Sequence, residues 1–127
     1  MKSIKRFSFR NRVNSFQYAF SGLRLLFREE HNARIHVVFA LVAIVLGFLF
    51  PISILEWGLV VFAIGFVLVT EILNTSIENL ADLISTERNK SIKTLKDLAA
   101  ASVLVSAITA CIIGMLVFIP KIYSAYF

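Results

Sequence analysis

Cysteine and proline are scarce in this sequence, and one common nucleotide-binding loop is missing. The 127 residues include one cysteine, Cys111, and two prolines, Pro51 and Pro120. One cysteine cannot form a disulfide within the chain, so we interpret Cys111 as a small packing residue. Each proline follows a long apolar segment and predicts the end of a helix. Because no Gly-x-x-x-x-Gly-Lys phosphate loop occurs, any bound nucleotide would be held by side chains on helices.

Charge is also missing from two long segments, and this absence predicts membrane spans. Val37–Leu55 has 19 residues and Leu98–Pro120 has 23, and neither contains a charged side chain. Crossing a bilayer takes roughly 20 apolar residues, so we expect spans over about 33–50 and 94–119. Between them lies one more expected span, the second along the chain, over about 55–84, which is unusual because its last third carries polar side chains.

The polar residues of this second span, over about 55–84, fall on one face of a helix. Glu71, Asn74, Glu78 and Asp82 follow one another at steps of 3, 4 and 4 residues. On a helix these positions lie within an arc of about 80°, so they form one narrow polar stripe. Carboxylates at membrane depth are costly, and they usually face the interior of a bundle and carry function. We therefore expect the chemistry at this stripe. Because three helices alone would cover it poorly, we also expect a homo-oligomer.

An amphipathic pattern precedes the first span. We expect residues 1–11 to be an irregular basic arm, followed by a helix from about Arg12 to Phe27 that lies in the membrane interface. Its apolar residues form one face: Val13, Phe16, Phe20, Leu23 and Phe27. Packing of this face against the cytoplasmic end of the bundle is a compatible alternative. We expect the whole chain, residues 1–127, to form a single domain. The basic arm and the interfacial helix together occupy its residues 1–30.

The basic residues gather at one end of the chain, and their placement predicts its orientation. The net charge is +5, and seven of the 13 Lys and Arg precede Glu29. The turn after the first span has no Lys or Arg, whereas the loop after the second has four. The positive-inside rule then places the N-terminus and the second loop in the cytoplasm and the C-terminus outside. We expect anionic lipid, rather than nucleic acid, as the partner of the basic arm. We expect no cleaved signal peptide, because the first long apolar run begins near residue 37.

This orientation brings acids and a lysine from three helices to the cytoplasmic face. Glu30 precedes the first span and Lys96 opens the third, both at the level of the stripe. Mg²⁺ typically takes one or two carboxylates and completes its shell with water and phosphate oxygens, so Glu30 and Glu78 form the natural pair. Glu71 lies deepest and could accept a proton from a substrate hydroxyl at the headgroup level. Lys96 can balance phosphate charge.

Several of these residues also have a structural explanation. Glu71 could be buried for pairing with a Lys or Arg, although its own span contains neither. Asp82 could be the solvated end of a helix, and Lys96–Asp97 could be a loop ion pair or a helix start. His31 and His36 could ligate a metal, but neither has a Cys or His partner at ligand spacing. Small residues at every fourth position of the third span favour helix packing: Ser102, Ser106, Ala110 and Gly114.

Two longer motifs give the sequence a family resemblance. Residues 71–82 read Glu-x-x-Asn-Thr-x-Ile-Glu-x-x-x-Asp, and residues 96–104 read Lys-Asp-x-Ala-Ala-x-x-Val-Leu. The upstream segments Tyr18-Ala-Phe-Ser-Gly-Leu and Glu30-His-Asn-Ala-Arg-Ile-His agree as well. From about residue 12 to 118, the sequence resembles the prokaryotic diacylglycerol kinases and their undecaprenol kinase relatives.

The resemblance implies a homotrimeric all-α protein of the bacterial inner (plasma) membrane, with an interfacial helix, three transmembrane helices per chain and a cytoplasmic active site. Such enzymes transfer the γ-phosphoryl group of ATP, with Mg²⁺, to the primary hydroxyl of a lipid. By this resemblance Glu71 is the general base, and Glu30 and Glu78 hold Mg²⁺. The other matching positions are assigned to the nucleotide, its phosphates and the polar cluster around the metal: Arg12, Tyr18, Asn74, Asp82, Glu87, Lys96 and Asp97.

The acceptor lipid and a rival function stay open. Diacylglycerol kinases of the Gram-negative type have Asn-Glu-Ala-Ala-Phe-Arg-Gln-Glu where this chain has Glu29 to His36. The Asn-x-Arg-Ile-His pattern found here looks more like the undecaprenol kinase branch. A small ion- or proton-coupled transporter could use Glu71 as its carrier acid, but the dry outer halves of the spans disfavour it. A subunit that only anchors a partner would leave the stripe unexplained.

Overall fold

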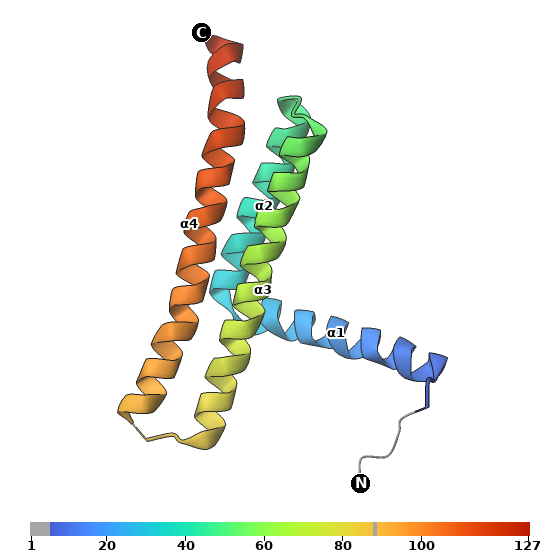
Figure 1. Cartoon of the computed structure of the whole chain (residues 1–127), viewed down its shortest axis with the longest axis vertical. Coiled ribbons are helices and arrows are strands. Elements are labelled where there is room, and N and C mark those ends of the chain that lie inside the picture. The colour runs from blue at the N-terminus through green and yellow to red at the C-terminus, as the bar shows by residue number, and fades with distance from the viewer. Residues whose placement is uncertain (1–5, 88) are drawn as a thin grey trace.

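The computed structural model describes residues 6–87 and 89–127, which form four helices (Figure 1). They are α1, Phe9–Glu29; α2, His31–Leu49; α3, Ile54–Ile84; and α4, Lys90–Tyr126. Helices α2, α3 and α4 run alongside one another, and each is long and apolar enough to cross a membrane. Helix α1 extends sideways from them. The described ranges contain no strand, so the predicted all-helical class with three candidate spans is confirmed.

Helix α1 begins earlier than the sequence predicted. The Ser8 side chain accepts a hydrogen bond from the Asn11 N–H at 3.5 Å and caps a helix that starts at Phe9. The expectation of an irregular arm up to residue 11 is therefore wrong for residues 9–11, and residues 1–5 lie outside the described residues. Phe16 and Phe20 of the predicted apolar face are exposed, as side chains in contact with lipid would be.

A corner joins α1 to α2. The backbone N–H of Glu30 donates to Leu26 O at 2.9 Å, which closes the last turn of α1. The Arg34 guanidinium donates to the carbonyl oxygens of Phe27 and Arg28, so α2 satisfies carbonyls that the end of α1 leaves free. Buried Leu26 and Ala33 pack on the two sides of this corner. The corner fixes Glu30 at the point where α1 meets α2 and α3.

The other end of the bundle is apolar and closely packed. A tight turn after α2 leads to Ser53, which caps α3 in a capping box with Glu56. Gly47 of α2 faces the ring of Trp57, and a Cβ atom added at Gly47 would lie 2.6 Å from that ring. Val60 of α3 and Val117 and Phe118 of α4 form the buried cluster at this end. We call this region the outer end.

Helices α3 and α4 form the main contact of the chain. Midway along it, the hydroxyls of Thr70 and Ser106 lie 2.7 Å apart in a buried hydrogen bond. Ser106 is fully buried, so this member of the small-residue series does let α4 approach α3 closely. With 31 and 37 residues, α3 and α4 exceed the roughly 30 Å hydrocarbon core at about 1.5 Å per residue, and they continue past the level of α1 (Figure 1).

The predicted end of the last helix at Pro120 is wrong. Helix α4 continues through Pro120 to Tyr126. Proline fixes a φ angle that a helix accepts, and its main cost is one missing backbone hydrogen bond. Ending the helix there would expose more backbone groups to lipid, which costs more than that single bond. The added turns also place Lys121 Nζ 3.7 Å from Glu56 Oε2 at the start of α3.

Candidate active site

Glu71 is the most deeply buried acidic side chain among the described residues. It lies on α3, directly after Thr70, and its side chain is 2% exposed. Its nearest charged or chargeable partner is His36 of α2, whose Nε2 atom lies 3.1 Å from Glu71 Oε1. That contact lacks the alignment of a hydrogen bond. Within the described residues no Lys or Arg pairs with Glu71, so the structural explanation by pairing with a basic side chain finds no support.

The stripe continues from Glu71 toward the C-terminal end of α3. Asn74 Nδ2 donates a long hydrogen bond of 3.5 Å to Glu78 Oε1. Glu30, from the corner between α1 and α2, and Glu78 both lie close enough to Glu71 to act on it electrostatically. A single chain therefore places Glu30 and Glu78 within electrostatic range of Glu71.

Thr75 belongs to this stripe, and the sequence analysis missed it. It lies about 40° from Glu71 around the helix, at the edge of the stripe and about 20° beyond Asp82. Its Oγ1 atom is buried and has no hydrogen-bond partner, and the same is true of Glu71 Oε1 and Asn74 Oδ1. An unpaired buried polar group costs roughly 1–3 kcal/mol, so three of them on one face indicate a place that polar atoms from outside the chain complete. Helical spacing alone could have revealed Thr75.

A second polar level lies beyond the first. Lys96 Nζ of α4 contacts Asp82 Oδ1 of α3 at 2.5 Å. Asp82 is 11 residues after Glu71, or about 16 Å along the helix. Lys96 was expected near this level, but its pairing with Asp82 was not foreseen. Asp97 points elsewhere and pairs with Lys93 on the exposed side of α4, also at 2.5 Å. Asp97 therefore forms an ion pair with Lys93 inside α4, which differs from the loop ion pair or helix start considered for Lys96–Asp97.

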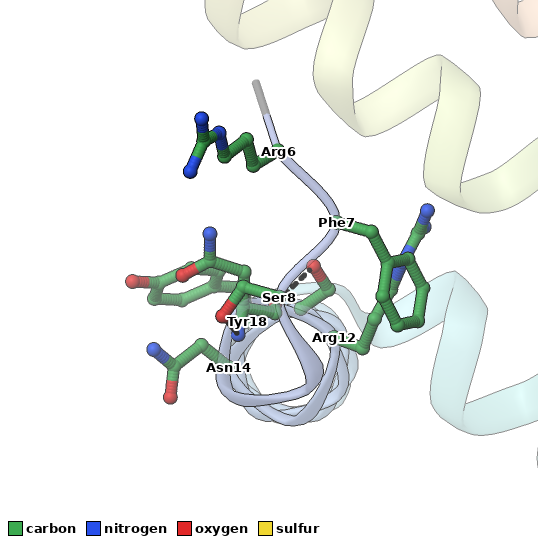
Figure 2. Close-up of a pocket in the computed structure, with 8 residues that line it drawn as sticks. Arg6, Phe7, Ser8, Arg12, Asn14 and Tyr18 are labelled. Carbon is green, nitrogen blue, oxygen red and sulfur yellow. Dashed lines mark hydrogen bonds between the residues drawn. The ribbon is translucent and has the colours of Figure 1, made fainter.

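Three further predicted residues are not brought to the stripe within the described chain. Glu87 is exposed in the turn after α3, where its N–H bonds to Ser85 Oγ at 3.2 Å. Arg12 and Tyr18 line a polar hollow on the far part of α1 (Figure 2). The Arg12 guanidinium carbon lies 5.5 Å from the ring centre of Phe7. Figure 1 shows α1 extending sideways from the three long helices, and the hollow lies on its N-terminal part.

The donor atoms at the first level suit Mg²⁺ better than a transition metal. The described residues contain no group of three or more His, Cys, Asp and Glu side chains that could hold a metal by themselves. Mg²⁺ needs no such cage, since one or two carboxylates with water and phosphate oxygens suffice. Glu30 and Glu78 can supply the two carboxylates. His31 is exposed at the start of α2, and His36 faces Glu71.

Several known proteins resemble this chain over most of its length. The family model described as prokaryotic diacylglycerol kinase matches residues 17–118. An undecaprenol kinase of Bacillus subtilis (strain 168) is 39% identical over 117 residues, which cover 89% of this chain and 95% of that protein. A diacylglycerol kinase of Synechocystis sp. is 30% identical over 90% of this chain and 66% of that protein. A diacylglycerol kinase of Helicobacter pylori (strain ATCC 700392 / 26695) is 34% identical over 79% of this chain and 78% of its own length.

Proposed function

Since this chain belongs to the prokaryotic diacylglycerol kinase family and is a lipid kinase, we propose that it transfers the γ-phosphoryl group of ATP to the primary hydroxyl of a membrane lipid. We place undecaprenol ahead of diacylglycerol as the acceptor, giving undecaprenyl phosphate rather than phosphatidic acid. The relative named undecaprenol kinase, which is 39% identical over nearly its whole length, supports this order. The Asn-x-Arg-Ile-His pattern before Val37 supports it as well.

The buried Glu71 carboxylate carries the proposal. Glu30 of the α1–α2 corner is close enough to act on it electrostatically, and in this proposal the carboxylate meets a hydroxyl held at the headgroup level. In the proposed step Glu71 accepts the hydroxyl proton while the lipid oxygen bonds to the γ-phosphorus. The bond from that phosphorus to the bridging oxygen breaks, and ADP leaves. Phosphoryl transfer asks a protein mostly for positioning and charge neutralisation, which suits a site made of helix side chains.

The remaining stripe residues serve the metal and the phosphates in this proposal. Glu30 and Glu78 would hold Mg²⁺, and Asn74 orients Glu78 through its amide. The bound ion neutralises phosphate charge and so supports transfer. Lys96, held by Asp82, would balance phosphate charge with its ammonium group. Asp97 and Glu87 are assigned to the nucleotide by the family resemblance alone, since one chain does not bring them to the stripe.

The polar hollow on α1 favours a homotrimer. Within one chain α1 carries Arg12 and Tyr18 away from the stripe, so they would reach a nucleotide only at the stripe of a neighbouring copy. The proposed assembly therefore places the hollow of one subunit beside the stripe of the next, on the cytoplasmic side of the inner membrane. A transporter gains no support, because the outer end of the helices is an apolar cluster.

The test uses purified protein in mixed detergent–lipid micelles. It is given Mg²⁺ and ATP labelled in the γ-phosphate, with either undecaprenol or diacylglycerol, and EDTA replaces Mg²⁺ in the control. We expect Mg²⁺-dependent label in lipid, faster with undecaprenol. Folded protein that labels neither lipid would contradict the function, and faster labelling of diacylglycerol would reverse the order of acceptors.

A further inference from the structure

We propose that His36 is a positioning residue that holds the Glu71 carboxylate in place for the acceptor hydroxyl; this rests on the proposed role of Glu71. The contact joins two helices, because His36 comes from α2 and Glu71 from α3. Their Nε2 and Oε1 atoms lie 3.1 Å apart. The chain also offers a close comparison in His31, which lies five residues earlier and is exposed.

The surroundings of Glu71 leave His36 as the side chain that can position it. The other charged groups near Glu71 are Glu30, from the α1–α2 corner, and Glu78, about two turns further along α3 on the same face. Both are acids and would repel a carboxylate rather than hold it. The ion pairs of Lys93, Lys96 and Lys121 are made with other acids. An attractive contact to the Glu71 carboxylate therefore comes from the imidazole.

His36 also separates Glu71 from an apolar groove. The groove lies between α2, α3 and α4, has a volume of about 440 Å³, and is lined by His36 together with apolar side chains and Cys111. His36 is 22% exposed, whereas Glu71 behind it is 2% exposed. Without the imidazole, the carboxylate would border apolar surface on that side, and its side chain would have no fixed direction.

An imidazole suits this task better than a lysine or arginine would. It can donate one N–H while neutral, so it can orient a carboxylate without a permanent positive charge beside it. A permanent charge would stabilise the ionised carboxylate and make it a poorer proton acceptor. The contact is not yet aligned as a hydrogen bond, as is common for catalytic contacts before the substrate binds.

The test compares the wild type with four variants in the micelle assay with labelled ATP and undecaprenol or diacylglycerol. His36→Ala and His36→Leu remove the polar contact, and His36→Gln keeps an N–H donor near the position of Nε2. His31→Ala is the matched control. We expect Ala and Leu to lower kcat about 100-fold with little change in KM for either substrate, since a small misplacement of a reacting group can cost that much. His36→Gln should keep at least about a third of wild-type kcat, and His31→Ala should match the wild type.

Three results separate the possibilities, and thermal unfolding identifies variants that fail to fold. If the wild type labels neither lipid, the proposed function fails. If the wild type is active and the folded Ala and Leu variants both remain within about threefold of it, only the positioning role fails. If His36→Gln is as slow as His36→Leu, an N–H donor is not sufficient, and the positioning role is again overturned. If one apolar variant does not fold, the other decides together with His36→Gln.

Discussion

The two ends of the α3–α4 pair are built from the same helices but differ in whether their polar groups are hydrogen-bonded within the chain. At the outer end Glu56 accepts the Ser53 N–H at 2.7 Å, and Ser53 Oγ accepts the Glu56 N–H at 3.1 Å. Lys121 approaches the same carboxylate from α4. In the second half of α3, from Glu71 onward, which we call the inner end, Glu71, Asn74 and Thr75 each bury an oxygen that has no hydrogen-bond partner. The outer end is complete within one chain, whereas the inner end is not.

This difference separates residues that stabilise the fold from residues that are left for a substrate. Buried polar groups in native structures are nearly always paired, so a cluster of exceptions needs a cause. Here the exceptions lie on one stretch of α3, where Glu30 and Glu78 are close enough to act electrostatically on Glu71. Substitutions at the inner end should therefore change turnover, and those at the outer end should change stability.

The largest effect on turnover is expected from Glu71→Gln. The amide keeps the size of the side chain but cannot accept the hydroxyl proton, so turnover should fall by at least about 100-fold, the usual contribution of a general base. Binding of Mg²⁺ and ATP should change little, as measured by equilibrium titration in micelles. Strongly weakened ATP binding would instead place Glu71 among the metal ligands.

Glu78→Gln should raise the Mg²⁺ requirement or abolish activity. A neutral amide is a poor ligand for Mg²⁺ in place of a carboxylate, so more metal is needed to fill the site. A titration of activity against Mg²⁺ measures this change. Glu29→Gln is the matched control, because Glu29 is an exposed acid beside the same corner. Unchanged Mg²⁺ dependence in Glu78→Gln would remove Glu78 from the metal site.

Gly47→Ala should act on the outer end and lower stability. Its Cβ atom would lie 2.6 Å from the Trp57 ring, so the ring must shift. Overpacking of this kind costs about 1–3 kcal/mol in the free energy of unfolding, which thermal or denaturant unfolding in micelles would detect. Gly65→Ala is the control, since its Cβ would meet nothing within 4 Å. Equal stability of the two variants would show that the Gly47–Trp57 contact does not limit packing.

Glu56→Gln should have the smallest effect. Glutamine can still accept the Ser53 N–H of the capping box, and only the partly exposed contact to Lys121 loses its charge. We expect a slight decrease in the midpoint of thermal unfolding and unchanged turnover. A large loss of activity would show that the outer end takes part in catalysis.

The sequence predicted what depends on spacing along one helix. Uncharged runs located the spans, and steps of three and four placed Glu71, Asn74 and Glu78 on one face. It could not predict contacts that depend on how two helices are rotated against each other. The 3.1 Å approach of His36 to Glu71 and the pairing of Lys96 with Asp82 are both contacts between helices.

Predictions from local sequence rules were wrong or incomplete where the rest of the protein determines the structure. Proline normally ends a helix, yet α4 continues beyond Pro120, because lipid penalises a broken backbone more than one lost hydrogen bond. Thr75 carries only a hydroxyl, so a stripe defined by charged and amide side chains does not include it. Arg12 and Tyr18 lie on α1 as expected, but no sequence pattern told in which direction α1 would point.

The central claim is that one helix carries a catalytic carboxylate at its inner end and a structural one at its outer end. The most direct test applies the same substitution to both: turnover and the midpoint of thermal unfolding are measured side by side for Glu71→Gln and Glu56→Gln in identical micelles. We expect Glu71→Gln to lose turnover while remaining folded, and Glu56→Gln to keep turnover with slightly lower stability. If both variants lost turnover and stability together, or if Glu71→Gln stayed active, the separation of the two ends would be contradicted.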